Sequence, residues 1–222
     1  MPARSNMKVV LGIGNPGREY AATRHNAGFR VLDLVAGRLP AGGWRRKFRG
    51  RVAEGALGGE KVLLVKPGTF VNLSGECARE VLAFHKVEPS DLLVVCDDVN
   101  LKMGRLRCRR SGRSGGHHGL DSVAERLGTD AFPRLRVGVG LPWCGGKNGR
   151  GGDDGERDLV GHVLSGFAPS EAEAAERAES RAADAVMEWI VRGTESCMNR
   201  FNGPEDPEAG DGQEGPAPGR EP

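Results

Sequence analysis

The segment Asp91-Leu-Leu-Val-Val-Cys-Asp97 decides the fold class of this chain, because it is the most strand-like run in the sequence. Five apolar residues follow one another between two aspartates, which is typical of a strand buried on both faces. Strands of this kind lie in sheets that helices cover on both sides. We therefore predict a buried strand over residues 91–97 and expect helices before and after it.

Strands and helices alternate along the chain on either side of this segment. Short strand-like runs predict strands at residues 8–13, 51–57, 61–65, 104–108 and 135–139. Apolar residues at helical spacing predict helices at residues 26–39, 74–85, 118–127 and about 170–192. The alternation predicts an α/β fold with one domain over residues 1–202. We expect a three-layer sandwich with a mixed, mostly parallel central sheet and helices on both faces.

Two helix starts can be predicted at the level of single residues. Ser74 is expected to cap the helix at 74–85, with Phe84 among the residues that face inward. Ser170 and Glu173 have the spacing of a capping box, so we expect them to open the last helix.

Composition excludes several classes of protein. The chain has 222 residues, 38% of them hydrophobic, and no apolar run approaches the roughly 18 residues of a membrane span. Residues 1–7 hold no apolar core of a secretory signal, and the five cysteines are scattered without a Cys-x-x-Cys pair. We expect a cytoplasmic protein without a membrane segment, a disulfide framework or a structural zinc site.

The formal net charge of +2 conceals two regions of opposite sign. Residues 203–222 carry six acidic side chains and one arginine, among five prolines and five glycines. That composition cannot bury enough apolar surface to fold, so we predict a disordered acidic tail. The remaining residues then carry a net charge of +7, which favours an anionic partner. A second Gly-rich stretch predicts a flexible loop over residues 143–158 inside the domain.

Gly12-Ile-Gly-Asn-Pro-Gly17 follows the first predicted strand and has the form Gly-x-Gly-x-x-Gly. This pattern binds dinucleotides when a helix opens at once and an acidic residue ends the next strand. Here Pro16 interrupts the loop, polar residues continue to Asn26, and Asp33 falls inside a predicted helix. We therefore set aside a dinucleotide-dependent oxidoreductase.

Four polar residues stand at predicted junctions between strands and helices: Asn15, His25, Asn72 and Asp97. The sites of α/β proteins lie at the carboxyl ends of their strands, so these side chains can meet there. A carboxylate that accepts the ring N–H of a histidine raises the basicity of the ring, and asparagine amides can bind a carbonyl oxygen. The set suits hydrolysis by an activated water. Each residue taken alone would also serve as a helix cap or turn residue.

Four segments carry a resemblance to a known family. Residues 11–28, Leu-Gly-Ile-Gly-Asn-Pro-Gly-Arg-Glu-Tyr-Ala-Ala-Thr-Arg-His-Asn-Ala-Gly, resemble the N-terminal signature of the bacterial peptidyl-tRNA hydrolases. Residues 66–75, 96–101 and 114–120 resemble three further blocks of that family in the same order. The resemblance implies hydrolysis of the ester between peptide and tRNA, which releases both and recycles prematurely released peptidyl-tRNA. It also implies a monomeric cytoplasmic enzyme without metal or cofactor.

The family's functional residues can be carried over where its motifs match this sequence. The resemblance implies that His25 is the catalytic base and that Asp97 orients it. It implies that Asn15 and Asn72 position the substrate. The side chains that it assigns to substrate and tRNA binding are Tyr20, Phe70, Asn72, His118, Arg107, Arg109 and Arg136.

Three positions depart from the residues that the family usually has. His118 stands where an asparagine is common, Val71 where a methionine is frequent, and Asn100 where an aspartate is frequent. None of them replaces His25 or Asp97, so the resemblance still implies an active hydrolase.

Two other kinds of chemistry are not expected. An ester with a ribose leaving group needs no covalent nucleophile, so we expect Ser74, Cys96 and Cys108 to be cap and core residues. The adjacent His117 and His118 are no metal site, because successive side chains diverge and no carboxylate or third histidine is suitably spaced in the sequence.

Basic residues gather at residues 102–113, a stretch without any acidic residue. If residues 104–108 form a strand, Arg105, Arg107 and Arg109 project to one face at a spacing that suits a phosphate backbone. The resemblance implies that such residues contact the acceptor stem and 3′ end of tRNA. A charged edge strand protected from aggregation is the structural alternative.

The alternative function is that of a non-catalytic RNA-binding protein of the same fold, related to organellar splicing factors. Such a protein would tolerate the loss of His25 or Asp97. Because the sequence retains both residues and both asparagines, it favours the enzyme.

Overall fold

The computed structural model describes residues 7–40, 42–141 and 159–203. Within these ranges seven strands form one sheet in the order β2-β3-β4-β1-β5-β7-β6. Their bounds are β1 (Met7–Gly12), β2 (Arg45–Lys47), β3 (Gly50–Leu57), β4 (Glu60–Pro67), β5 (Leu92–Asp98), β6 (Leu106–Arg109) and β7 (Arg134–Gly138). The neighbours β4, β1, β5 and β7 are parallel, whereas β3 and β6 are antiparallel to β4 and β7. The predicted mixed, mostly parallel sheet is confirmed.

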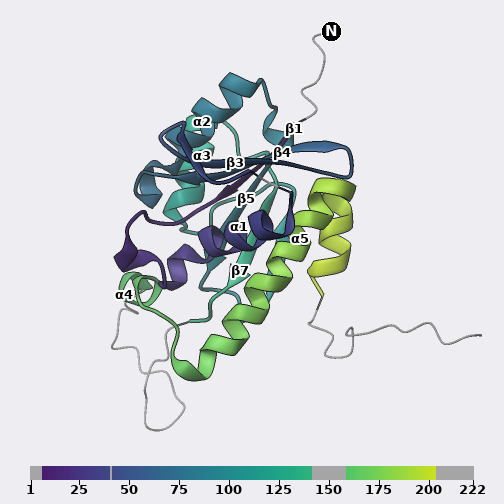
Figure 1. The fold of residues 1–222 in the computed structure, drawn as a ribbon. Helices are drawn as coiled ribbons and strands as arrows, with labels where there is room; N and C mark the ends of the chain where they lie inside the picture. Colours follow the sequence, from purple (N-terminus) through teal and green to yellow (C-terminus); the bar gives the residue numbers. More distant parts are fainter. Residues whose placement is uncertain (1–6, 41, 142–158, 204–222) are drawn as a thin grey trace, which may run out of the picture.

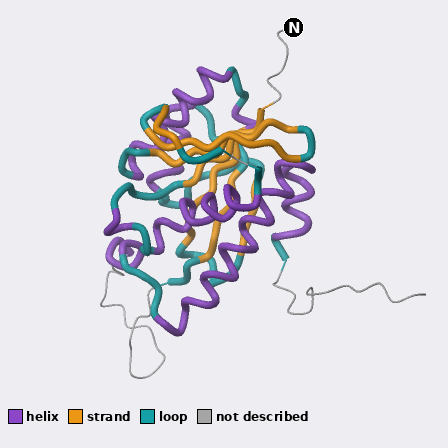
Figure 2. The backbone as a smooth tube through the Cα atoms, in the orientation of Figure 1, coloured by secondary structure: helices purple, strands orange, loops and turns teal. Residues whose placement is uncertain are grey.

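Helices cover both faces of this sheet. They are α1 (Ala27–Arg38), α2 (Ser74–His85), α3 (His118–Leu127), α4 (Leu159–Leu164) and α5 (Pro169–Phe201), with 3-10 turns η1 (Arg18–Tyr20), η2 (Arg24–Asn26), η3 (Val71–Leu73) and η4 (Pro89–Asp91). Figure 1 shows α1 and α5 in front of the strands, while α2 and α3 lie on the other side. Figure 2 shows the strands enclosed between these helices, which confirms the predicted three layers.

The alternation of side chains along the central strands builds two hydrophobic cores. All seven residues of β5 are buried. Its Leu93 and Val95 pack in the core with α1 and α5, whereas Leu92 and Val94 pack in the core with α2 and α3. A strand covered on both faces needs apolar residues at every position, which is why the run at 91–97 is continuous rather than alternating.

Two predictions about α2 are wrong. Phe84 is 62% exposed, because the buried stripe of α2 includes Cys77, Ala78, Val81 and Leu82, and position 84 falls outside it. Ser74 does not cap the helix. The turn η3 runs directly into α2, so the backbone of Ser74 is already helical and its hydroxyl has no hydrogen bond among the described residues.

The last helix begins and ends differently from the sequence prediction. Its start involves Ala168 and Glu171 rather than Ser170 and Glu173, because Glu171 Oε2 accepts a hydrogen bond of 2.8 Å from the backbone N–H of Ala168. The helical path is interrupted at Gly193, where φ is 81°, close to the predicted end at about residue 192. A second helical segment follows and packs its Cys197 and Phe201 into the core on the α1 side.

Other predicted elements match in part. The predicted strand at 104–108 begins two residues later, at Leu106, and the sequence prediction lacked β2 and α4. The predicted flexible loop at 143–158 lies outside the described residues, as does the predicted tail beyond Gly203. Within the described ranges, no helix is long and apolar enough to cross a membrane.

Candidate active site

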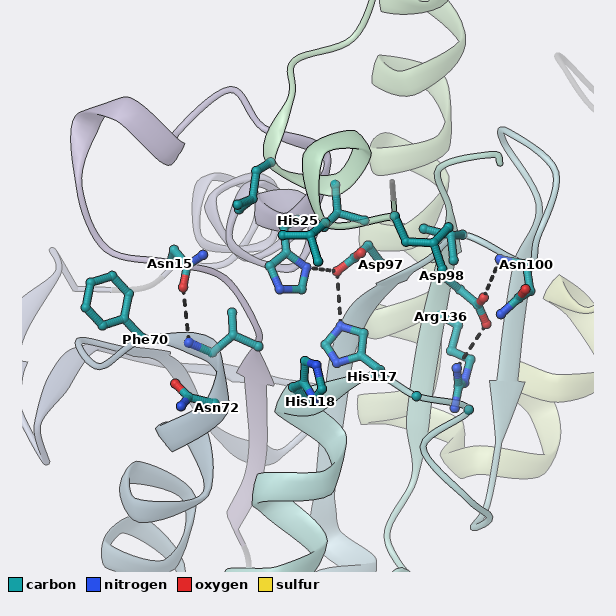
Figure 3. Close-up of a pocket in the computed structure, with 18 residues that line it drawn as sticks. Asn15, His25, Phe70, Asn72, Asp97, Asp98, Asn100, His117, His118 and Arg136 are labelled. Carbon is teal, nitrogen blue, oxygen red and sulfur yellow. Dashed lines mark hydrogen bonds and ion pairs between the residues drawn. The ribbon is translucent and has the colours of Figure 1, made fainter. Parts of the chain in front are cut away.

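A cavity of about 470 Å³ opens where the carboxyl ends of the central parallel strands meet. The segment after β1 brings Asn15 to it, η3 after β4 brings Asn72, and the end of β5 brings Asp97. His25 enters from η2, the turn that leads into α1. The structure therefore brings together all four residues that the sequence placed at strand–helix junctions (Figure 3).

His25 and Asp97 form a hydrogen-bonded pair beside this cavity. His25 Nδ1 lies 2.8 Å from Asp97 Oδ1, and the side chains are 15% and 3% exposed. Because an ionised carboxylate only accepts hydrogen bonds, the ring proton of His25 belongs on Nδ1. His25 Nε2 then has a free lone pair, and no hydrogen bond joins it to another described residue. This is the arrangement of a general base and its orienting carboxylate.

The carboxylate of Asp97 remains ionised in spite of its burial. Burial alone would raise the pKa of the Asp97 carboxyl. The two histidine rings that face it, first His117 and then His25, outweigh burial and hold that pKa well below its usual range. Asp97 is therefore a permanent negative acceptor at the pH at which a histidine titrates.

His117 is a site residue that the sequence analysis missed. Its Nε2 lies 3.1 Å from the same Asp97 oxygen that His25 contacts, and its side chain is 8% exposed. The two rings stand 5.3 Å apart between centroids. Its sequence signals were its place just before a predicted helix and within residues 114–120, which resemble a block of the family. Figure 3 shows that it reaches Asp97 from the start of α3.

Around His117 the structure differs from the sequence prediction, which expected no suitably spaced carboxylate or third histidine. A carboxylate and a second histidine do lie near it, because one atom each of His25, Asp97 and His117 falls within 4.8 Å of the others. The hydrogen bonds nevertheless disfavour a metal ion. A metal on His117 Nε2 would require the ring proton on Nδ1, which already accepts hydrogen bonds from the backbone N–H groups of Gly119 and Leu120.

Asn15 is held by three hydrogen bonds to Asn26 and Val71. Its backbone N–H donates to Asn26 Oδ1 at 2.8 Å, and Asn26 Nδ2 donates to Asn15 O at 2.9 Å. Its side-chain Oδ1 accepts from the backbone N–H of Val71 at 3.1 Å. These bonds determine the amide orientation and leave Asn15 Nδ2 without a partner among the described residues. Asn15 can therefore donate to a substrate carbonyl oxygen.

The other residues assigned to the substrate divide into two groups. Phe70, Asn72 and His118 line the cavity, and all three are exposed. Tyr20 does not line it. It lies in η1, where its carbonyl oxygen accepts from the hydroxyl of Thr23.

One wall of the cavity is apolar and comes from α4, which the sequence did not predict. Leu159, Val160, Val163 and Leu164 all line the cavity from this helix. His162 fastens α4 to the end of β7 by a 2.9 Å hydrogen bond to the carbonyl oxygen of Gly140. A six-residue helix has too little periodicity to be predicted from its own sequence.

Arg136 is committed to contacts within the protein. It is 11% exposed and pairs with Asp98 at 3.0 Å. Its other guanidinium nitrogen donates to the carbonyl oxygens of Arg113 and Ser114, which orders the loop that leads to His117. In this structure its guanidinium therefore holds the loop before His117 against the end of β5.

Arg107 and Arg109 differ from Arg136 because both side chains are exposed on the edge strand β6. Neither has an ion pair within the described part of the chain. Arg105 precedes the strand and bonds the carbonyl oxygen of Asn202 at 3.4 Å, while Arg110 pairs with Glu195. Of the three arginines that the resemblance assigns to tRNA, Arg107 and Arg109 therefore remain available to a ligand.

The residues that the sequence analysis excluded as nucleophiles are inaccessible to a substrate in this structure. Ser74, Cys96 and Cys108 are completely buried. Burial raises the pKa of the Cys96 thiol, which keeps it protonated.

Comparison with known proteins agrees with this geometry. The family model described as peptidyl-tRNA hydrolase matches residues 9–209. The chain belongs to the peptidyl-tRNA hydrolase family. It is 43% identical over 197 residues to the peptidyl-tRNA hydrolase of Thermoanaerobacter pseudethanolicus, covering 89% of this chain and all of the relative. It is 46% identical over 220 residues to that of Synechococcus sp. strain JA-3-3Ab, covering 98% and 92%.

Solved structures of this family have the same fold. The crystal structure of peptidyl-tRNA hydrolase from Acinetobacter baumannii is similar with a TM-score of 0.79 and 29% identity, covering 91% of this chain and 97% of that one. A complex of peptidyl-tRNA hydrolase with N-propanol is similar with a TM-score of 0.78 and 30% identity, with the same coverage.

Proposed function

We propose that this protein hydrolyses the ester bond between the peptide and the 3′ ribose of peptidyl-tRNA, with a water molecule activated by His25. The observation that supports this most strongly is the His25–Asp97 pair at 2.8 Å, with the second ring nitrogen of His25 unpaired at the cavity. Family membership supports the same substrate, since the relatives are named for it.

Each step of the proposed reaction has a group to carry it. His25 Nε2 takes a proton from water, and the resulting hydroxide attacks the ester carbonyl carbon. Asn15 Nδ2 donates to the carbonyl oxygen as negative charge develops there, and Asn72 holds the adjoining peptide group. The bond from the carbonyl carbon to the ribose oxygen then breaks. The imidazolium of His25 returns its proton to that oxygen, giving a free peptide acid and tRNA.

The two parts of the substrate have different requirements. The apolar wall of α4 and Phe70 suit peptide side chains of varied sequence. Arg107 and Arg109 suit phosphates of the acceptor stem, and such contacts carry no base information. We expect the enzyme to act as a monomer in the cytoplasm, where its substrate arises, without a metal or cofactor. The non-catalytic RNA-binding alternative is not favoured.

The test is release of the blocked amino acid from N-acetyl-aminoacyl-tRNA by the full purified chain in the presence of a chelator. The wild type should turn over, and His25→Ala should lose about 10³-fold in kcat while it still binds tRNA. His85→Ala is the matched control, because His85 packs against Phe48 and Phe84 outside the cavity.

Two results would contradict the proposal. No turnover by the wild type would favour the RNA-binding alternative. Full activity of His25→Ala would eliminate the proposed base.

A further inference from the structure

We propose that His117 is a positioning residue that is held as the neutral Nε2–H tautomer and donates that proton to the carboxylate shared with His25. Its role is to limit how strongly Asp97 attracts the proton of His25. The role in turnover rests on the proposed function, whereas the tautomer itself does not.

The start of α3 determines the tautomer of His117. His117 is the N-cap residue of that helix, and its Nδ1 accepts from the backbone N–H groups of Gly119 at 3.1 Å and Leu120 at 3.4 Å. The first N–H groups of a helix have no partner inside it, so a capping acceptor is favourable. A proton on Nδ1 would face both donors and break both bonds. Nδ1 therefore stays bare, and the ring proton lies on Nε2.

The geometry at Asp97 gives this proton its function. Nε2 of His117 points at Asp97 Oδ1 over 3.1 Å, and His25 Nδ1 approaches the same oxygen at 2.8 Å. One carboxylate oxygen thus accepts two imidazole N–H groups, and the donor from His117 takes up part of its negative charge. Without that donor, Asp97 would stabilise the imidazolium form of His25 more strongly, and His25 would be protonated at higher pH.

Charged groups on the neighbouring elements are engaged elsewhere or exposed. Asp98 is paired with Arg136, Arg24 with Glu171, Arg30 with Glu179, and Asp33 with Lys66, while His162 bonds the carbonyl oxygen of Gly140 and His118 is exposed at the cavity. A change at His117 therefore acts on His25 through Asp97, the residue that both rings contact.

Two substitutions separate the two hydrogen-bonding functions of His117. His117→Asn keeps a side-chain acceptor at the N-cap, where asparagine is favoured, but cannot reach Asp97 with a donor. His117→Gln places an amide N–H near the position of Nε2 and loses the cap. Each variant is compared with the wild type by thermal unfolding and by the pH at which His25 titrates, measured by NMR of ¹⁵N-labelled histidine.

The expected results differ for the two variants. In His117→Asn the midpoint of the His25 titration and the acidic limb of kcat/KM should both move to higher pH by about half a unit to one unit, while the N-cap acceptor of α3 is kept. In His117→Gln both should stay close to the wild type while the melting temperature falls. A merely structural role would move stability and leave the titration of His25 unchanged.

The tautomer has a direct readout. In the wild type, the ¹⁵N spectrum should show His117 Nδ1 as an unprotonated nitrogen and Nε2 as a protonated one throughout the titration of His25. A protonated Nδ1 at neutral pH would overturn the proposal, as would an unchanged His25 titration in His117→Asn. Both NMR measurements can be made without any catalytic turnover. Their failure can therefore be distinguished from failure of the proposed function.

Discussion

The cavity and the edge strand β6 hold their polar side chains in opposite ways. At the cavity, Asp97 accepts from two histidines and Asn15 is fastened through Asn26 and Val71, all by hydrogen bonds of 2.8 to 3.1 Å. On β6, Arg107 and Arg109 extend from the surface without an ion pair among the described residues. A preorganised group accelerates a reaction, because no reorganisation is needed as charge develops. A flexible cation instead binds a polyanion whose charges are spread along its length.

The first prediction from this comparison tests its preorganised half. Asn15→Asp keeps the acceptor for the backbone N–H of Val71 but replaces the free amide donor with a second oxygen. We expect kcat to fall by about 10²-fold, since the loss of one donor to a developing oxyanion typically costs that much. Single-turnover hydrolysis of N-acetyl-aminoacyl-tRNA measures it.

Asn100→Asp is the control for this variant. It adds the same charge to a residue at the same cavity whose side chain has no assigned role. Equal losses of kcat in the two variants would show that the added charge, and not the lost amide donor of Asn15, causes the effect. This result would contradict the role given to preorganised groups at the cavity.

The next effect concerns β6. Replacing Arg107 and Arg109 with glutamine should raise KM by roughly tenfold and reduce the slope of log KM against log salt by up to about 2, with kcat little changed. Steady-state kinetics between low and moderate salt measures both. The matched control is the double change of Arg45 and Arg46 to glutamine on the opposite edge strand β2, which removes the same net charge.

A fall in kcat rather than a rise in KM would show that β6 acts on the chemistry. An equal effect of the β2 control would show that only the net charge matters.

The smallest effect is on stability in acid. The pKa of Asp97 is lower in the folded protein than in the unfolded chain. Its ionised form therefore stabilises the fold fully above the unfolded value of about 3.9, and this contribution is lost as the pH falls through the folded value. The difference in unfolding free energy between the wild type and Asp97→Asn should narrow below about pH 4. Urea unfolding from pH 6 to pH 3 measures it, and a constant difference would show that Asp97 is not held as proposed.

Local pattern was sufficient for the elements whose own residues carry the signal. The helix at 118–127 has the bounds that the sequence predicts, and the strand at β5 differs by one residue. Two of the wrong predictions concern helix starts, which depend on the segment that precedes each helix. Ser74 cannot cap α2 because η3 precedes it, and Glu171 rather than Glu173 bonds the first turn of α5 because the helix begins at Pro169. The helix α4 is too short to have a readable period.

The sequence likewise predicted some residues of the candidate site and missed others. Asn15, His25, Asn72 and Asp97 could be named because each stands at a strand–helix junction, and parallel strands bring their carboxyl ends to one edge. His117 could not be named in this way, because its role depends on two contacts that the local sequence does not reveal. One is Asp97, twenty residues away, and the other is the first turn of α3.

The sequence by itself determined the α/β class, the family and the residue types that suit hydrolysis, since these follow from local hydrophobic pattern and from motifs of consecutive residues. Only the tertiary structure decided which basic residues can reach a ligand and which are bound within the protein. Arg136 and Arg107 lie on adjacent strands, yet Asp98 and two carbonyl oxygens occupy the first while the second faces solvent. Pairing of this kind depends on groups that are distant in sequence, because hydrogen bonds and ion pairs act over a few ångströms in space.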